Sequence, residues 1–226
     1  MSSVPRAREP APAASDLRVT EIFLSLQGES RTAGWPTVFV RLTGCPLRCR
    51  YCDTAYAFRG GRRMAREAIV QAVRDYGVSR VTVTGGEPLA QRGCLGLLAA
   101  LCDAGHEVSL ETSGALDIGG VDPRVVRVLD LKTPGSGECA RNRYENLDLL
   151  APRDQVKFVC CDRADYEWAR ERIARHALTG RCEVLLSPSH GVLEPGRLAD
   201  WILEDRLAVR LQIQLHKYLW GDVPGR

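Results

Sequence analysis

Three cysteines, Cys45, Cys49 and Cys52, lie within one short segment, GCPLRCRYCDT (residues 44–54). Thiolates are soft ligands that bind iron–sulfur clusters, and a cube-shaped 4Fe–4S cluster takes four of them. Three ligands therefore predict a cluster whose fourth iron is left open. An open iron can bind and reduce a small molecule, whereas a fully ligated cluster mainly passes electrons.

Other interpretations of the triplet are weaker. A zinc knuckle needs a fourth cysteine or histidine at short range, and the next candidate, Cys94, is far along the chain. A disulfide framework does not fit an odd number of cysteines at such tight spacing. Chance clustering among the nine cysteines of the chain stays open at this point.

A second segment, Thr84-Gly-Gly-Glu-Pro88, follows the β-branched run 81–84, which is typical of a buried strand that ends in a turn. A turn of glycines lets a ligand approach the backbone, and Glu87 can pair with a cation. Together with the cysteine triplet, this turn resembles the radical S-adenosylmethionine superfamily. The resemblance implies that S-adenosylmethionine chelates the open iron and that the turn binds its methionine end.

The size and composition of the chain set broad limits. Its 226 residues and 45% hydrophobic content predict one globular domain, and the Ala-, Pro- and Arg-rich start predicts a disordered N-terminal tail over 1–16. The resemblance implies that residues 17–226 form a single radical S-adenosylmethionine domain. A net charge of +3 and the lack of a long apolar stretch argue against a nucleic-acid or membrane partner. The abundant cysteines and the lack of an apolar leader predict a reducing, cytoplasmic location.

Hydrophobic periodicity predicts alternating strands and helices. Strands are expected over 18–26, 37–42, 81–84, 107–111, 125–131, 156–160, 183–186 and 209–213, and helices over 65–76, 95–101, 165–177 and 198–207. This alternation is typical of an α/β protein with a parallel sheet. The chain is shorter than the roughly 250 residues of a closed eight-fold barrel, so we predict a partial, open βα barrel of the radical S-adenosylmethionine type. The residues with reactive side chains follow the strands, where α/β sites form.

Four further segments narrow the family: EIFLSLQGE (21–29), VRLTGC (40–45), CDT (52–54) and QLHKYLW (214–220). In combination they resemble the 7-carboxy-7-deazaguanine synthase family of queuosine biosynthesis. The resemblance implies a carbon–nitrogen lyase that contracts the ring of 6-carboxy-5,6,7,8-tetrahydropterin with loss of ammonia. It also implies a 4Fe–4S cluster, S-adenosylmethionine, Mg²⁺, a homodimer and an external electron donor such as flavodoxin or ferredoxin.

The same resemblance assigns roles to individual residues. The cluster ligands would be Cys45, Cys49 and Cys52, and Thr54 would bind Mg²⁺. The contacts to S-adenosylmethionine would be Tyr51, Cys52, Asp53, Gly86, Glu87, Ser113 and Ser136. The pterin would be bound by Leu26, Gln27, Gly28, Arg41 and Thr84.

Some of these assignments have plain structural alternatives. Arg41 lies in an apolar strand, where it needs an anionic partner, and either a substrate carboxylate or an internal salt bridge would serve. Thr54 could cap the next turn, and Ser113 and Ser136 could be ordinary turn serines. Ser30 stands where the family pattern has glycine.

Two other functions compete with the synthase. An activase that installs a glycyl radical on a partner protein also carries this cysteine spacing, but it needs no pterin pocket. A non-catalytic iron–sulfur electron carrier needs neither the Gly-Gly-Glu-Pro turn nor a barrel.

Overall fold

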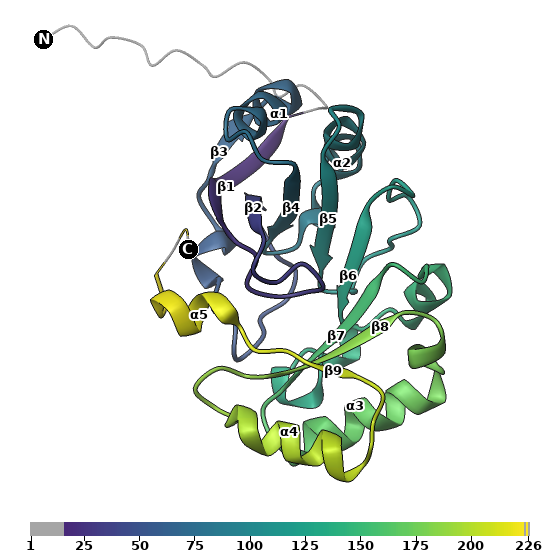
Figure 1. Ribbon diagram of the computed structural model, residues 1–226. Coiled ribbons are helices and arrows are strands. Elements are labelled where there is room, and N and C mark those ends of the chain that lie inside the picture. The colour runs from purple at the N-terminus through teal and green to yellow at the C-terminus, as the bar shows by residue number, and fades with distance from the viewer. Residues whose placement is uncertain (1–15, 224, 226) are drawn as a thin grey trace, which may run out of the picture.

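The computed structural model describes residues 16–223 and 225. The predicted disordered tail, 1–16, lies outside the described residues except for Asp16. Nine strands form one sheet in the order β3-β1-β2-β4-β5-β6-β7-β8-β9 (Figure 1). Their bounds are β1 Leu17–Leu26, β2 Pro36–Leu42, β3 Arg62–Met64, β4 Arg80–Gly85, β5 Glu107–Thr112, β6 Val126–Asp130, β7 Gln155–Cys160, β8 Glu183–Pro188 and β9 Arg210–Leu211.

The sheet is an open partial barrel, as predicted, because β3 and β9 remain its two edges. From β2 to β9 every neighbouring pair is parallel. The expectation of a parallel sheet misses the first three strands, since β1 pairs with both β2 and β3 in antiparallel fashion. The loop over 27–35 is too short for the crossover that a parallel β1–β2 pair needs, so these strands form a hairpin.

In the part of the chain that the structure describes, five α-helices accompany the sheet: α1 Arg66–Arg74, α2 Cys94–Asp103, α3 Arg163–Arg175, α4 Pro195–Glu204 and α5 Leu215–Trp220. In Figure 1, α1 and α2 lie side by side against the β1–β5 half of the sheet, and α3 and α4 lie against the β7–β8 half. The first four helices match the predicted ones within a few residues at each end. Strand β3 and helix α5 were not predicted, because both are too short to show a clear period.

The connections between β5 and β6 and between β6 and β7 contain no α-helix among the described residues. Short 3₁₀ turns take its place in the second connection, at Pro134–Ser136, Cys139–Arg141 and Tyr144–Leu149. The hydrophobic core lies between the sheet and the outer helices and includes the fully buried Leu17, Leu42, Leu98 and Phe158. Because the hydrophobic core lies on the helix side of the sheet, the polar side chains of the candidate site line the inner face of the barrel.

Within the described residues, no helix has both the length and the apolar character needed to cross a membrane.

Candidate active site

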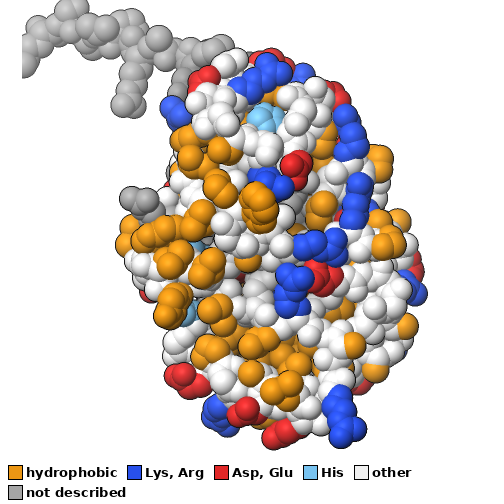
Figure 2. All heavy atoms as spheres, viewed as in Figure 1, with side chains coloured by type: hydrophobic (Ala, Val, Ile, Leu, Met, Phe, Trp, Pro, Cys, Tyr) orange, Lys and Arg blue, Asp and Glu red, His pale blue; other side chains and the backbone are white. Residues whose placement is uncertain are grey.

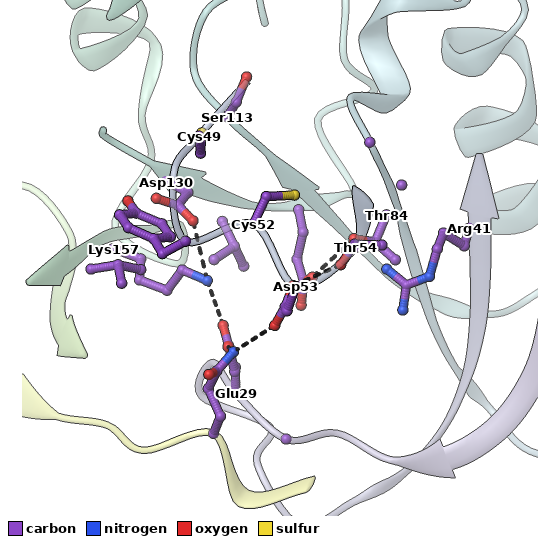
Figure 3. Close-up of a pocket in the computed structure, with 18 of the residues that line it drawn as sticks. Glu29, Arg41, Cys49, Cys52, Asp53, Thr54, Thr84, Ser113, Asp130 and Lys157 are labelled. Atoms are coloured by element: carbon purple, nitrogen blue, oxygen red, sulfur yellow. Dashed lines mark hydrogen bonds and ion pairs between the residues drawn. The ribbon is translucent and has the colours of Figure 1, made fainter. Parts of the chain in front are cut away.

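A cavity of about 240 Å³ opens at the carboxyl ends of the parallel strands, next to the loop that follows β2 (Figure 3). In parallel α/β folds this is the edge at which active sites form. Thirteen of the predicted site residues line it: Leu26, Gln27, Gly28, Arg41, Cys45, Cys49, Tyr51, Cys52, Asp53, Thr54, Thr84, Gly86 and Ser113. The fold therefore collects in one place residues that are widely separated in the sequence.

The three cysteines form one set of donors on the wall of this cavity. All are free, partly exposed thiols, and the Cys52 amide donates to the Cys49 carbonyl (3.2 Å) in a tight turn. Burial raises the pKa of Cys49 to about 11 and also raises the pKa values of Cys45 and Cys52. The charges of Cys45 and Cys52 add to the shift at Cys49, because the thiols lie close together. Soft donors that converge on one cavity fit an iron–sulfur cluster, whose binding would displace their protons.

A glycine is required at Gly86, directly after β4, because the loop that carries the three cysteines (residues 44–54, the cysteine loop) crosses over it. A Cβ on Gly86 would lie 2.4 Å from the Gly44 carbonyl oxygen and 2.7 Å from the Cβ of Cys45. The Gly86 amide donates to the Leu42 carbonyl (3.2 Å), and the Glu87 amide donates to the Gly44 carbonyl (2.8 Å). The Gly-Gly turn therefore lets the cysteine loop pack against the end of β4 and holds it there.

Two predicted contacts, Glu87 and Ser136, are not among the residues that line the cavity. Glu87 is fully buried, and its carboxylate accepts hydrogen bonds from the Leu89 amide (3.0 Å), the Thr112 hydroxyl (2.9 Å) and both the amide and the hydroxyl of Ser113. A carboxylate has about four acceptor positions, so these donors occupy it. Through these hydrogen bonds Glu87 joins the ends of β4 and β5, and its contact with S-adenosylmethionine stays a prediction.

The buried hydroxyl of Ser136 is also used within the protein. It donates to the Thr133 carbonyl (2.6 Å) and accepts from the Glu138 amide (3.0 Å). The Ser136 carbonyl accepts from the Arg50 amide (2.9 Å), which fixes the cysteine loop from its other side. Ser136 thus supports the loop in the manner of a turn serine, the alternative considered for it above.

Thr54 lines the cavity directly after the last cysteine, and its hydroxyl donates to Asp53 Oδ1 (2.7 Å). Burial alone would raise the pKa of Asp53, but the hydrogen bond from Thr54 and the charge of Lys217 outweigh it and lower that pKa to about 2. The Thr54 proton is therefore directed at an ionised carboxylate, and the lone pairs of Oγ1 stay available. Between residues 16 and 223, no three acidic, histidine or cysteine side chains are arranged to hold a single metal ion. A 4Fe–4S cluster differs from this case, because each cysteine binds a different iron.

Arg41 forms the internal salt bridge, one of the two partners expected for it, and its contact with a substrate carboxylate stays a prediction. Its Nε donates to Glu21 Oε1 (2.7 Å), which also accepts from the Tyr56 hydroxyl (2.8 Å). The guanidinium carbon lies 5.8 Å from the Phe23 ring centroid and 5.9 Å from that of Tyr56. Figure 3 shows the side chain reaching from β2 toward Thr54 at the cavity wall. The internal salt bridge exists, and it holds the guanidinium at the edge of the cavity.

Comparisons with known proteins agree with these motifs. Residues 39–177 match the family model of the Radical SAM superfamily. The 7-carboxy-7-deazaguanine synthase of Chlorobaculum tepidum is 49% identical over 91% of this chain and 94% of its own length. The synthase of Koribacter versatilis is 45% identical over 90% of this chain and 97% of its own length. The chain belongs to the 7-carboxy-7-deazaguanine synthase family.

A solved structure supports the fold of this family member. The crystal structure of QueE from Escherichia coli matches with a TM-score of 0.73 at 22% identity, covering 89% of this chain and 95% of that one. At that identity the match concerns the fold, which it shares over nearly the full length.

In this synthase family member, charged residues that the sequence did not point to form the floor of the cavity. Lys157 on β7 forms ion pairs with Glu29 and with Asp130 (3.3 Å), and Asp130 also pairs with Lys132 (3.1 Å). Figure 3 shows Lys157 between the two carboxylates. Burial and the charge of Glu29 raise the pKa of the neighbouring Glu111. These ion pairs place both signs of charge on the cavity floor.

Glu111 connects this floor to two of the predicted pterin contacts. Its carboxylate accepts from the Thr84 hydroxyl (3.1 Å) and from Gln27 Nε2 (3.3 Å). Gln27 Nε2 also donates to the Thr82 hydroxyl (3.1 Å). Gln27 and Thr84 are therefore held in fixed orientations at the cavity wall.

The C-terminal residues complete the cavity of this synthase relative. Gln214, His216 and Lys217 line it, and the Leu215 amide donates to the Gly28 carbonyl (3.0 Å). A Cβ on Gly28 would lie 2.0 Å from His216 Nδ1, so any larger residue at this position would force the His216 side chain to move. The sequence marked both QLHKYLW and the Gln-Gly-Glu segment as family motifs. It did not indicate that these two segments contact each other.

Proposed function

We propose that this cavity contracts the ring of 6-carboxy-5,6,7,8-tetrahydropterin to 7-carboxy-7-deazaguanine with loss of ammonia, in queuosine biosynthesis. The observation that carries the proposal is the presence of thirteen predicted residues on one cavity, in a chain whose curated relatives are named 7-carboxy-7-deazaguanine synthase. Because the proposed reaction breaks a carbon–nitrogen bond to release ammonia, the protein would be a carbon–nitrogen lyase.

The cofactors we propose are a 4Fe–4S cluster on Cys45, Cys49 and Cys52 and S-adenosylmethionine beside it. Bound there, the two cofactors would supply the carbon radical that abstracts a hydrogen atom from the substrate. Asp130 could accept a hydrogen bond from S-adenosylmethionine. Its Oδ1 is buried and has no hydrogen-bond partner among the described residues. A buried carboxylate oxygen of this kind is satisfied by an ammonium or a hydroxyl on a ligand.

The substrate carboxylate would be held by Arg41. Its Nε is engaged by Glu21, so the bidentate fork formed by its two Nη groups is the part that can bind a carboxylate. Gln27 and Thr84, oriented by Glu111, would hydrogen-bond the edge of the pterin. Such fixed contacts hold one carbon of the substrate at the position where hydrogen abstraction occurs.

Thr54 would bind Mg²⁺ together with substrate oxygens and water. Mg²⁺ prefers six oxygen ligands and keeps several waters, so one threonine hydroxyl is sufficient only in a site shared with substrate. The Thr54 hydroxyl suits Mg²⁺ because it is a hard oxygen ligand on the cavity wall. Its proton points to Asp53, which leaves its lone pairs for the metal.

The remaining proposals concern location and partners. All nine cysteines are free thiols, which supports a reducing cytoplasmic location. An external donor such as flavodoxin or ferredoxin would reduce the cluster.

We also propose a homodimer, because hydrophobic side chains gather around α5 (Figure 2), where Tyr218 is 80% exposed.

The test is anaerobic incubation of the iron-reconstituted protein with carboxytetrahydropterin, S-adenosylmethionine, Mg²⁺ and a reductant, with products identified by mass. We expect 7-carboxy-7-deazaguanine and ammonia from the parent and neither from Cys49→Ala. Cleavage of S-adenosylmethionine without ring contraction would instead favour the activase alternative.

A further inference from the structure

The last part of the chain forms a strap across the mouth of the cavity. This strap, residues 212–220, leaves β9 and runs back to the loop that follows β1. It is attached there by a hydrogen bond from the Ser30 amide to Gln212 Oε1 (2.7 Å) and by one from the Leu215 amide to Gly28 (3.0 Å). These contacts join the C-terminal end of the sheet to its N-terminal hairpin.

Two strap side chains converge on one oxygen of the cysteine loop. Lys217 Nζ lies 3.3 Å from Asp53 Oδ2, and Gln214 Nε2 lies 3.2 Å from the same atom. Gln214 Nε2 also donates to Glu29 Oε1 (3.0 Å), so it spans the two loops. The Lys217 side chain is only 10% exposed, and such an ammonium is well placed to fix a carboxylate.

The other oxygen of Asp53 acts on Thr54. Because the Thr54 hydroxyl donates its only proton to Asp53 Oδ1, its lone pairs are turned away from that carboxylate (Figure 3). A carboxylate that receives the proton of a ligating group orients that ligand and increases its basicity. The orientation of the threonine oxygen thus depends on how firmly the strap holds Asp53.

We propose that Lys217 and Gln214 are positioning residues for the divalent cation, acting through Asp53 on the Thr54 hydroxyl. This inference rests on the Mg²⁺ site of the proposed function. It assigns to Asp53 a role in orienting a metal ligand that is separate from its predicted contact with S-adenosylmethionine.

The test compares metal binding in four proteins: the parent, Lys217→Met, Lys217→Arg and Asp222→Asn. The last is a matched control, because Asp222 is the second partner of Lys217 (2.9 Å) and its side chain is 76% exposed. Each reconstituted holoenzyme is mixed with S-adenosylmethionine and substrate, without reductant, and titrated with Mn²⁺ as a probe. Bound Mn²⁺ is followed by the loss of the free-ion signal in electron paramagnetic resonance.

We expect Lys217→Met to weaken Mn²⁺ binding up to about 10-fold, the lower end of the range found when a direct partner of a metal ligand is removed, because Lys217 acts through Asp53. Lys217→Arg should retain much of the affinity, and Asp222→Asn should match the parent. The cluster spectrum and the affinity for S-adenosylmethionine should not change in any of the four. If Lys217→Met fails to fold, Gln214→Leu, which removes the other donor to the same oxygen, takes its place.

Equal Mn²⁺ affinity in the parent and in Lys217→Met would overturn the inference while leaving the Mg²⁺ site intact. If the parent itself binds no Mn²⁺ with substrate present, the metal part of the proposed function fails, and the inference fails with it. A loss of S-adenosylmethionine affinity equal to the loss of Mn²⁺ affinity would assign the strap to the cofactor instead of to the cation.

Discussion

Replacement of Lys157 by methionine removes one charge from the floor of the cavity and should strongly destabilise the protein. The Lys157 side chain is 11% exposed and pairs with Glu29 and Asp130, whose side chains are 12% and 17% exposed. Asp130 keeps Lys132 as a partner after the substitution, but Glu29 loses its only ion pair among the described residues. A nearly buried carboxylate is then left without a compensating charge.

The size of the effect follows from this burial. Removal of one partner from a buried ion pair costs about 3–5 kcal/mol, because the other charge stays desolvated. For a protein of this length, each kcal/mol lowers the unfolding midpoint by about 2–4 °C. We therefore expect Lys157→Met to lower the midpoint by about 6–20 °C. The double variant Lys157→Met/Glu29→Gln should recover part of this loss, since it removes the orphaned charge as well.

The measurement is thermal unfolding of the metal-free protein under reducing, anaerobic conditions. Arg31→Met serves as a control, because the Arg31 side chain is 46% exposed and its pair with Glu183 should contribute less than about 1 kcal/mol. Burial alone would lower the pKa of Lys157, but Glu29 and Asp130 outweigh it and raise that pKa well above its usual value. The advantage of the parent over Lys157→Met should therefore be full below the unfolded pKa of about 10.4 and be lost as the pH rises further.

A drop in the midpoint no larger than that of Arg31→Met would refute this reasoning. So would a double variant less stable than Lys157→Met, because the ion pair would then not be the source of the loss. An advantage of the parent that grows above pH 10 would contradict the sign of the pKa shift.

Three further substitutions test other parts of the structure. Ser30 has a φ of 66°, so Ser30→Gly should be more stable than Ser30→Ala by about 1 kcal/mol in chemical unfolding, and the reverse order would exclude strain at this position. Glu87→Gln places an amide against N–H and O–H donors, and the unfolding free energy should fall by about 1.5–3 kcal/mol for each hydrogen bond lost; an unchanged value would show that Glu87 does not join β4 to β5. Gly28→Ala should cost about 1–3 kcal/mol through its overlap with His216, and a second change, His216→Ala, should relieve that cost, whereas strictly additive losses would argue against the close contact.

The local motifs could be predicted because each depends on residues near one another in the sequence. The cysteine loop and the Gly-Gly turn follow strands that hydrophobic patterning predicts, and Arg41 lies near the end of one of these strands. Parallel strands bring their carboxyl ends to one edge, so residues that follow strands meet there. The positive φ of Ser30 is in line with the glycine that the family pattern has at this position.

The charged floor could not be predicted, because its contacts depend on the order of strands in the sheet. Lys157 and Glu29 are 128 residues apart, and nothing near either residue indicates its partner. For Glu87 the position could be predicted but the hydrogen-bond partners could not. Its motif correctly placed it at the end of β4, whereas only the fold shows that Thr112 and Ser113, at the end of β5, donate to its carboxylate.

The central claim is that this cavity performs the ring contraction, and it is tested most directly with a substrate that carries deuterium at C6. The parent is incubated anaerobically with this substrate, a reductant, Mg²⁺ and less S-adenosylmethionine than substrate, and both are followed by mass. We predict more molecules of 7-carboxy-7-deazaguanine formed than of S-adenosylmethionine consumed. Deuterium should appear at the 5′ carbon of the recovered S-adenosylmethionine, because the product carbon that bears the carboxylate carries no hydrogen. Cleavage of S-adenosylmethionine that leaves the pterin intact, or a deazapurine yield that never exceeds the S-adenosylmethionine spent, would contradict the account.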